Sequence, residues 1–360
     1  MSSSQEPSDL NGKRLLLIKP SSLGDVCHAV ASAWALKARW PRLHLTWLVN
    51  ANFEPLLQGI SCIDATVAFD RGRFRGLLGV FRERTALRAF LSSLRGGGFD
   101  IALDMQGLLR SGMFAYVSKA PVRIGFAQAR EGARLFYTHQ VEAPRQPVHA
   151  RERYDALTSS LGCQRPLRED LDVKDAERQT AAALLTSRGF RGGPLLAVCP
   201  GARWESKRYP PESFARVLDQ LAGTAGSIQP VIVGSPEMAK VCAAVVSSCQ
   251  VARPIDLCGQ TDLRTLTALL GASRLLLTCD SGPMHLAAAQ GTKVLAILGP
   301  TDKRRTGPYG QLANVVTGEC ELMPCLKRQC PGLGDKCMQD LKPEAVAQKA
   351  LGLLREAEKS

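Results

Sequence analysis

The 360-residue sequence contains no long hydrophobic run. No stretch approaches the roughly 18 consecutive apolar residues that a bilayer-spanning helix needs. Residues 1–11 are polar and rich in serine, and they lack the apolar core of a signal peptide. We therefore expect no membrane-spanning segment, a disordered tail at residues 1–12, and a cytosolic protein whose thiols are mostly reduced.

Two familiar binding motifs and one metal-binding pattern are also missing. The first strand-to-helix turn has neither a G-x-G-x-x-G dinucleotide fingerprint nor a P-loop. Eight of the twelve cysteines are scattered like small core residues, and four cluster late in the chain without the C-x2-C pair of a usual zinc site. Reduced structural cysteines, a metal site and disulfides all stay open for these four, which are Cys320, Cys325, Cys330 and Cys337.

Acidic residues are fewer than basic ones. The chain has 46 Lys and Arg against 33 Asp and Glu, a net charge of +13 at pH 7. This excess favours an anionic partner, which includes nucleic acid, an acidic membrane surface or a phosphorylated substrate, although a basic composition can also have no role. No helix-turn-helix, RNP-like or zinc-finger pattern supports nucleic acid, so we expect none.

The stretch from Leu275 to Pro300 is the clearest structural unit. An apolar run, 275–279, predicts a buried strand, and Asp280 and Ser281 suit the start of the helix that follows. Residues 293–298 predict a second buried strand. In parallel sheets such a turn lies at the ligand-binding edge, and the helix N-terminus suits a phosphate.

The same turn contains two further candidate residues. Gly282 lets the backbone approach a ligand closely, and His285 lies in the first helical turn. A capped helix with a buried histidine fits the pattern equally well.

The N-terminal half repeats the strand–turn–helix pattern. Arg14 to Lys19 predicts a strand, and the next turn offers Asp25 as a general base, unless it is only a first-turn helix acid. Phe99 to Asp104 predicts another strand, and Gln106 and Arg110 follow it at the same sheet edge.

Arg71 to Arg95 is a basic amphipathic segment with seven arginines and one acid. We expect either a helix on an anionic membrane or substrate, or a solvated helix with its apolar face in the core.

The second half begins after a polar stretch near residues 165–175, where we place the domain boundary. Leu195 to Cys199 predicts its first strand, and the following turn carries Lys207 among other cations, as in a phosphate site or a solvated basic loop. Both halves alternate strand and helix, which predicts two doubly wound α/β domains facing across a cleft.

Three turns together are more specific than any one alone. They are K-P-S-S-L-G-D, P-G-A-R-W-E-S-K-R-Y-P and C-D-S-G-P-M-H-L-A-A-A. With D-M-Q-G-L-L-R-S and R-I-G-F, they resemble glycosyltransferase family nine, the ADP-heptose:lipopolysaccharide heptosyltransferases, from about Arg14 to about Leu354.

The resemblance implies a GT-B fold of two Rossmann-like domains. It implies an acceptor-binding domain at 13–170, a nucleotide-sugar-binding domain at 171–340, and a C-terminal helix at 341–360 that packs back on the N-terminal domain. The implied reaction is inverting, metal-independent transfer of heptose from ADP-L-glycero-D-manno-heptose to the lipopolysaccharide inner core. It needs no cofactor and takes place at the cytoplasmic face of the inner membrane. No D-x-D-like motif flanks the turns, which agrees with a metal-independent leaving-group site.

The resemblance also assigns site residues by their motif positions. Asp25 would be the general base, and Lys207 would contact the donor phosphates. The implied donor-binding residues are Thr261, Glu237, Asp280, Ser281, Gly282 and His285. The implied acceptor-binding residues are Ser22, Gly24, Gln106 and Arg110.

Other functions stay open. Ala202 and Arg203 stand where some family members have hydroxyl residues, so the donor sugar is not fixed. The alternatives are a relative that uses another nucleotide sugar or glycan acceptor, and a non-catalytic GT-B protein that binds only a nucleotide or an anionic lipid. The sequence does not indicate an oligomeric state.

Overall fold

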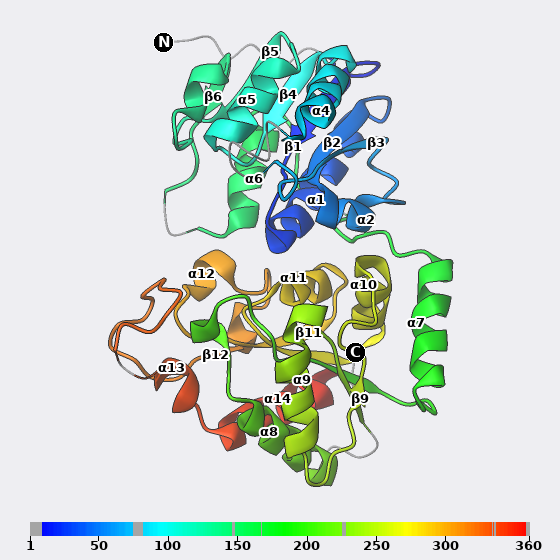
Figure 1. Ribbon diagram of the computed structural model, residues 1–360, viewed down its shortest axis with the longest axis vertical. Helices are drawn as coiled ribbons and strands as arrows, with labels where there is room; N and C mark the ends of the chain where they lie inside the picture. Colours follow the sequence, from blue (N-terminus) through cyan, green and yellow to red (C-terminus); the bar gives the residue numbers. More distant parts are fainter. Residues whose placement is uncertain are drawn as a thin grey trace. The chain divides into compact units, whose positions relative to one another are not determined.

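The structure is a computed structural model that describes residues 9–74, 82–145, 148–166, 168–224, 228–332, 334 and 336–357. Most of the expected tail, residues 1–8, and part of the basic segment, residues 75–81, lie outside the described residues. The chain divides into two compact units, Met1–Asp172 and Val173–Ser360 (Figure 1). The division falls two residues after the boundary expected from the sequence.

The described part of the first unit is built on a six-stranded sheet in the order β3-β2-β1-β4-β5-β6, and all of its pairings are parallel. Its strands are β1 (Arg14–Ile18), β2 (His44–Asn50), β3 (Ala65–Phe69), β4 (Ile101–Asp104), β5 (Val122–Phe126) and β6 (His139–Val141). Its helices are α1 (Leu23–Arg39), α2 (Glu54–Leu57), α4 (Arg84–Gly96), α5 (Leu109–Val117) and α6 (Ala150–Ser159), with the 3-10 helices η1 (Ala51–Phe53) and η2 (Ala133–Phe136).

The second unit repeats this plan with a six-stranded parallel sheet in the order β12-β11-β10-β7-β8-β9. Its strands are β7 (Leu195–Cys199), β8 (Gln229–Ile232), β9 (Ile255–Asp256), β10 (Leu275–Cys279), β11 (Lys293–Ile297) and β12 (Val315–Val316). Its longer helices are α7 (Asp175–Ser187), α8 (Pro211–Thr224), α9 (Ala239–Ser248), α10 (Leu263–Ala272), α11 (Gly282–Ala289) and α14 (Pro343–Ala357). Its short helices are η3 (Glu205–Lys207), η4 (Pro236–Met238), α12 (Lys303–Thr306), η5 (Leu312–Asn314) and α13 (Lys336–Gln339). The predicted α/β class with two parallel-sheet domains is confirmed.

The central strands of both sheets are mostly apolar and mostly buried. In β1, Leu15 pairs with Leu45 of β2 on one side and with Ile101 of β4 on the other. A strand that has neighbours on both sides and helices over both faces excludes water from its middle, so it reads as a nearly continuous apolar run instead of an alternating one. Because all pairings are parallel, the carboxyl ends of the strands in each sheet lie along one edge.

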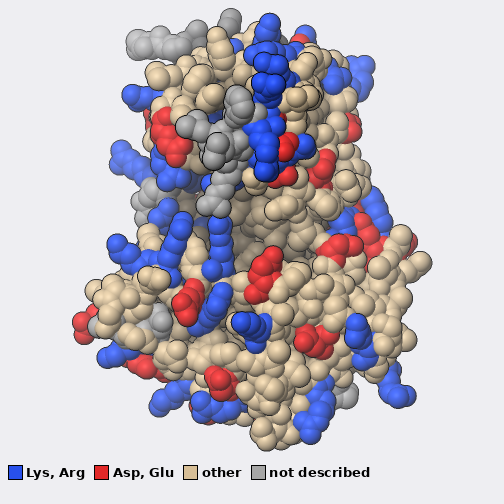
Figure 2. Space-filling model, viewed as in Figure 1, with Lys and Arg blue, Asp and Glu red and all other residues tan. Residues whose placement is uncertain are grey.

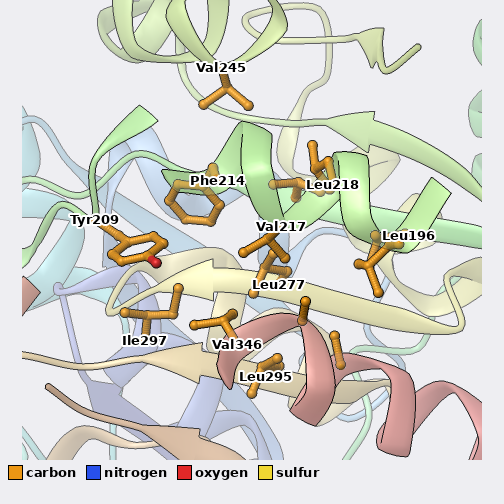
Figure 3. Packing of buried hydrophobic residues seen from close by; sticks show 14 of the residues in the cluster. Leu196, Tyr209, Phe214, Val217, Leu218, Val245, Leu277, Leu295, Ile297 and Val346 are labelled. Carbon is orange, nitrogen blue, oxygen red and sulfur yellow. The ribbon is translucent and has the colours of Figure 1, made fainter. Parts of the chain in front are cut away.

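The core of the second unit joins the sheet to α8 and to the last helix, α14. Tyr209 and Phe214 pack edge to face with 5.3 Å between their ring centres. Figure 3 shows these rings beside Leu277 and Ile297 of the sheet, with Val346 of α14 completing the cluster. The Tyr209 hydroxyl donates to the carbonyl of Leu341 just before α14, at 2.8 Å, so the core polar group is satisfied.

The last helix, α14, is part of the second unit. It contacts α8, β10 and β11 there, and its packing on the N-terminal domain, which the resemblance implied, stays a prediction. Its apolar face, which includes Val346, Ala350 and Leu353, is buried in the core cluster of that unit. The burial of this face explains the placement.

The basic segment also differs from the expected continuous helix. Residues 71–74 form a turn, in which the Asp70 carboxylate accepts from the backbone N–H groups of Gly72 and Arg73 at 2.9 and 3.1 Å. The helix α4 begins only at Arg84. Phe90 of this helix packs against Phe69 and Phe114 in the core of the first unit, so its apolar face supports the sheet.

Two surface properties bear on partners. None of the described helices has both the length and the apolar content to cross a membrane. On the face shown in Figure 2, basic and acidic side chains are interspersed among the described residues. The excess positive charge is therefore not gathered into one continuous block on this face.

The placement of α14 generates a stability prediction. Val346→Ala should lower the free energy of unfolding by about 2 kcal/mol, because it leaves a cavity between α14 and the sheet. Val251→Ala is the matched control, since Val251 is exposed and its truncation should change stability by less than about 0.5 kcal/mol. Equal effects in chemical denaturation would show that α14 is not part of this core.

Candidate active site

The first candidate site lies where β1 turns into α1. The backbone N–H and the hydroxyl of Ser22 both donate to the Asp25 carboxylate, at 3.0 and 2.8 Å. Lys19 Nζ lies 3.6 Å from the same carboxylate. Gly24 is buried in this first helical turn. The turn thus holds a carboxylate at the carboxyl edge of the sheet, where parallel sheets bind ligands.

A tyrosine from a distant helix completes this site. The Tyr154 hydroxyl, on α6, donates to Asp25 Oδ1 at 2.5 Å, and the Tyr154 ring centre lies 4.8 Å from Lys19 Nζ. Lys19 and Tyr154 are buried, whereas the Asp25 side chain is 32% exposed. Buried groups therefore hold the carboxylate while part of it stays accessible to a ligand.

The electrostatic setting keeps Asp25 ionised. Burial on its own would raise the pKa of Asp25, because a buried charge loses its hydration. The charge of Lys19 and the hydrogen bonds from Tyr154 and Ser22 outweigh burial and hold the pKa of Asp25 well below its usual range. Burial lowers the pKa of Lys19, although the negative charges of Asp25 and Asp104 act to raise it. At neutral pH Asp25 is thus a carboxylate, as a general base must be.

The neighbouring strand β4 ends in a structural carboxylate. Asp104 is fully buried and accepts from the backbone N–H groups of Gln106 and Gly107, at 2.8 and 3.1 Å, and from the Tyr137 hydroxyl at 2.6 Å. Burial raises the pKa of Asp104, although these hydrogen bonds oppose the rise. Asp104 therefore shapes the turn that presents Gln106.

The expected acceptor-binding residues are only partly gathered. The Gln106 side chain accepts from the backbone N–H of Ser21 at 3.4 Å, so it lies beside the Asp25 turn. Arg110, the second residue of α5, instead lies over the Phe69 ring, with 5.6 Å between the guanidinium carbon and the ring centre. Arg110 thus points toward the end of β3.

The second candidate site lies at the ends of β7 and β10, which are neighbours in the second sheet. The Lys207 ammonium donates to Asp280 Oδ2 at 2.8 Å, and the Thr301 hydroxyl donates to the same oxygen at 2.6 Å. Asp280 is buried, and the Lys207 side chain is 15% exposed. The carboxylate of Asp280 therefore fixes the position of the Lys207 ammonium at the sheet edge.

The start of α11 borders this ion pair. Ser281 precedes the helix, and its hydroxyl lies 3.1 Å from the Thr278 hydroxyl. Gly282 is the first helical residue, and His285 is buried in the first turn. The first N–H groups of a helix lack partners within the helix, so this terminus beside Lys207 suits an anion such as a phosphate.

The two remaining donor candidates lie farther along the same edge. Glu237 is exposed in η4 after β8, and a hydrogen bond from the Ser235 hydroxyl lowers its pKa. A Cβ added to Gly201 would come within 2.6 Å of the Met238 side chain, so η4 packs closely on the turn after β7. Thr261 follows β9 and precedes α10.

A cysteine-rich segment supports the Lys207 turn, a contact that the sequence did not indicate. The Ser206 hydroxyl donates to the carbonyl of Lys327 at 2.8 Å. Leu326 N–H donates to the carbonyl of Pro300 at 2.8 Å, one residue before the Asp280 partner Thr301. This segment therefore bridges two turns that hold the ion pair.

The four late cysteines, Cys320, Cys325, Cys330 and Cys337, line one small cavity in this segment. No disulfide joins any of the twelve cysteines, all of which lie within the described ranges. Within the described ranges, no three Cys, His, Asp or Glu side chains are grouped to hold a metal. Among the scattered cysteines, burial raises the pKa of Cys279 to about 12, which keeps it a neutral core thiol.

The sequence did not indicate two residues of the candidate sites, Tyr154 and Thr301. Tyr154 lies 129 residues after Asp25, and Thr301 lies 21 residues after Asp280. Neither has a local spacing signal, because both pairs form only when separate elements fold together. Thr301 follows β11, which is a weak signal for a site residue, whereas Tyr154 lies in the middle of α6 and has none.

The sequence matches a known protein family. Residues 87–334 match the family model described as glycosyltransferase family 9 (heptosyltransferase). The lipopolysaccharide core heptosyltransferase OpsX of Haemophilus influenzae is 27% identical over 310 residues, which cover 85% of this chain and 84% of that protein.

Solved structures share the fold. A family 9 glycosyltransferase from Veillonella parvula superposes with a TM-score of 0.80 at 24% identity, covering 98% of this chain and all of the other. E. coli heptosyltransferase WaaC, solved with ADP, superposes with a TM-score of 0.73 at 23% identity, covering 94% of this chain and 99% of the other.

The Asp25 environment generates a pH prediction. Because the folded-state pKa is lowered, the carboxylate stabilises the fold above its unfolded pKa of about 3.9, and this stabilisation is lost as the pH falls through the folded-state pKa. Asp25→Asn should therefore lower the free energy of unfolding by about 2 kcal/mol at pH 7 and by less at pH 3. A gap that is constant over this range would contradict the assignment, and Asp340→Asn at an exposed site is the control.

Proposed function

The chain belongs to glycosyltransferase family 9, and we propose that this glycosyltransferase moves heptose from ADP-L-glycero-D-manno-heptose to the lipopolysaccharide inner core. The acceptor would be Kdo-lipid A or a core that already carries heptose. The observation that carries the proposal is the Lys207–Asp280 pair beside the start of α11, since it offers a fixed cation and helix N–H groups to a diphosphate. Relatives named as lipopolysaccharide heptosyltransferases, and a WaaC structure with ADP, support this donor.

The donor half of the reaction depends on charge stabilisation. As the bond between the anomeric carbon and the diphosphate breaks, negative charge gathers on the phosphate oxygens. The Lys207 ammonium and the N–H groups from Ser281 onward stabilise that charge. Asp280, which also accepts from the Thr301 hydroxyl, holds Lys207 in place before the donor arrives, so little reorganisation is needed during the reaction.

The acceptor half depends on Asp25. Its carboxylate takes the proton from an acceptor hydroxyl while the hydroxyl oxygen bonds to the anomeric carbon. ADP leaves from the opposite side, so the anomeric configuration inverts. Tyr154 and Ser22 orient the two carboxylate oxygens, and the nearby Lys19 keeps the group ionised between turnovers.

The acceptor itself is anionic, which suits the basic first unit. Ser22, Gly24 and Gln106 lie at the Asp25 turn, and we assign them to the reacting sugar. Arg110 lies farther away, toward β3, and we assign it to a more distant part of the acceptor. Because lipid A is anchored in a bilayer, the enzyme works at the cytoplasmic face of the inner membrane.

Donor identity can be tested by calorimetric titration with ADP, UDP and GDP. ADP should bind selectively, and Lys207→Ala should weaken its binding by about 10–100-fold, because a charge-assisted contact to phosphate is lost. Lys13→Ala is the control, since Lys13 is exposed and precedes β1 at the opposite sheet edge. A preference for UDP or GDP would contradict the assignment of ADP-heptose as the donor. The absence of binding to all three nucleotides would favour a non-catalytic protein.

The general base can be tested by transfer kinetics. Asp25→Ala should lower kcat by about 10²–10⁴-fold, because the acceptor hydroxyl loses its proton acceptor. The affinity for ADP should stay within about twofold of the wild type, since Asp25 makes no donor contact in this account. If the Asp25→Ala variant transferred the sugar at the wild-type rate, Asp25 would not be the general base.

A further inference from the structure

The first unit exposes an unusual group of large apolar side chains. Leu109, Met113 and Tyr116 of α5 are 42%, 46% and 60% exposed, and Leu135 of η2 is 82% exposed. In the described part of the chain, these four make up more than half of the exposed large apolar residues. Single exposed apolar residues are common, but grouped ones mark an interaction surface.

The four side chains lie on two adjoining elements, and together they are here called the α5–η2 patch. Residues 109, 113 and 116 are spaced four and three apart, so they share one face of α5. A Cβ on Gly112 would come within 2.9 Å of the Ala133 carbonyl oxygen, so α5 lies directly against η2. The Tyr116 and Phe136 ring centres are 5.9 Å apart, which joins the helix face to the turn that carries Leu135.

The stretch of chain that carries the α5–η2 patch is rich in basic residues. Residues 105–137 contain five basic side chains and one acidic side chain, Glu131. The basic residues are Arg110, Lys119, Arg123, Arg130 and Arg134. Arg123 lies 5.7 Å from the Tyr116 ring centre. Glu131 is engaged locally, because it accepts from the backbone N–H of Leu109.

Helix α4 adds further positive charge next to α5. The two helices contact through the Phe90 and Phe114 rings, whose centres are 5.3 Å apart. Arg84, Arg88 and Arg95 of α4 are exposed. The patch therefore combines apolar side chains that can enter a bilayer interface with cations that can bind acidic headgroups.

We propose that the α5–η2 patch docks the protein on a bilayer that contains anionic phospholipid. A second copy of the chain fits this surface less well, because a symmetric contact would bring the same cations of both copies together. The chemistry of the bound species is a lipid headgroup layer with acyl chains beneath it, since a soluble anion would leave the apolar side chains in water.

The location of the patch connects it to the proposed acceptor. Helix α5 begins three residues after Gln106, whose side chain contacts the Asp25 turn through Ser21. A membrane-anchored acceptor therefore has only a short distance to span between the docked helix and the carboxylate. In this respect alone the inference rests on the proposed function.

The test is sedimentation of the full-length protein with phosphatidylcholine vesicles, with and without phosphatidylglycerol. The wild type should bind only the anionic vesicles, and added salt should weaken binding. Met113→Ser combined with Leu135→Ser should reduce the partition coefficient by about tenfold or more, because two buried apolar side chains are lost from the interface. Arg130→Glu combined with Arg134→Glu should reduce it as well.

Two controls make the outcome decisive. Val251→Ser changes a residue of the second unit that is 61% exposed, and it should bind vesicles like the wild type. Circular dichroism should show that every variant is folded. Equal binding by the patch variants and the wild type, or no binding by the wild type, would overturn the proposal, as would a concentration-dependent dimer that the patch variants abolish.

The vesicle assay contains neither donor nor acceptor. Its result therefore does not depend on whether the proposed enzymatic function is correct. If ADP binding is absent but the patch variants lose vesicle binding, the docking surface stands and the donor assignment falls. If ADP binds selectively but the patch variants bind vesicles normally, the enzyme assignment stands and the docking surface falls.

Discussion

Parallel strand pairing is the constraint on which both candidate sites depend. When every strand runs in the same direction, the turns that follow the strands collect at one edge of the sheet. In the first unit this brings Asp25 and Gln106 together from turns after β1 and β4. In the second it brings Lys207 and Asp280 together from turns after β7 and β10. Reversing β1, β4, β7 or β10 would move its turn to the opposite end of the sheet and remove a site.

The two lysine–aspartate pairs have opposite roles. Lys19 is buried behind Asp25, so the carboxylate is the member of that pair that a ligand can reach. Asp280 is buried behind Lys207, so there the ammonium is accessible. Each pair offsets the cost of burying a charge and presents the other charge to a ligand. A proton acceptor and a phosphate-binding cation are the two groups that an inverting transfer from a nucleotide sugar needs.

The sequence predicted what local patterns specify. The strand at 275–279 and the turn after it were found because a short apolar run followed by cap residues is a local signal. Strands of two residues, such as β9 and β12, carry no such signal. Three other features depend on contacts between distant segments. They are the hydrogen bond from Tyr154 to Asp25, the hydrogen bond from Ser206 to Lys327, and the packing of α14. These contacts follow from tertiary packing, so one sequence did not reveal them.

The central claim is that this chain transfers heptose with inversion. The most direct measurement incubates the purified protein with ADP-heptose and Kdo-lipid A, and follows the acceptor by mass spectrometry and the new linkage by NMR. We expect an acceptor heavier by one heptose residue, with the anomeric configuration opposite to that of the donor. No product with this acceptor or with a heptosylated one, or a product that keeps the donor configuration, would contradict the account.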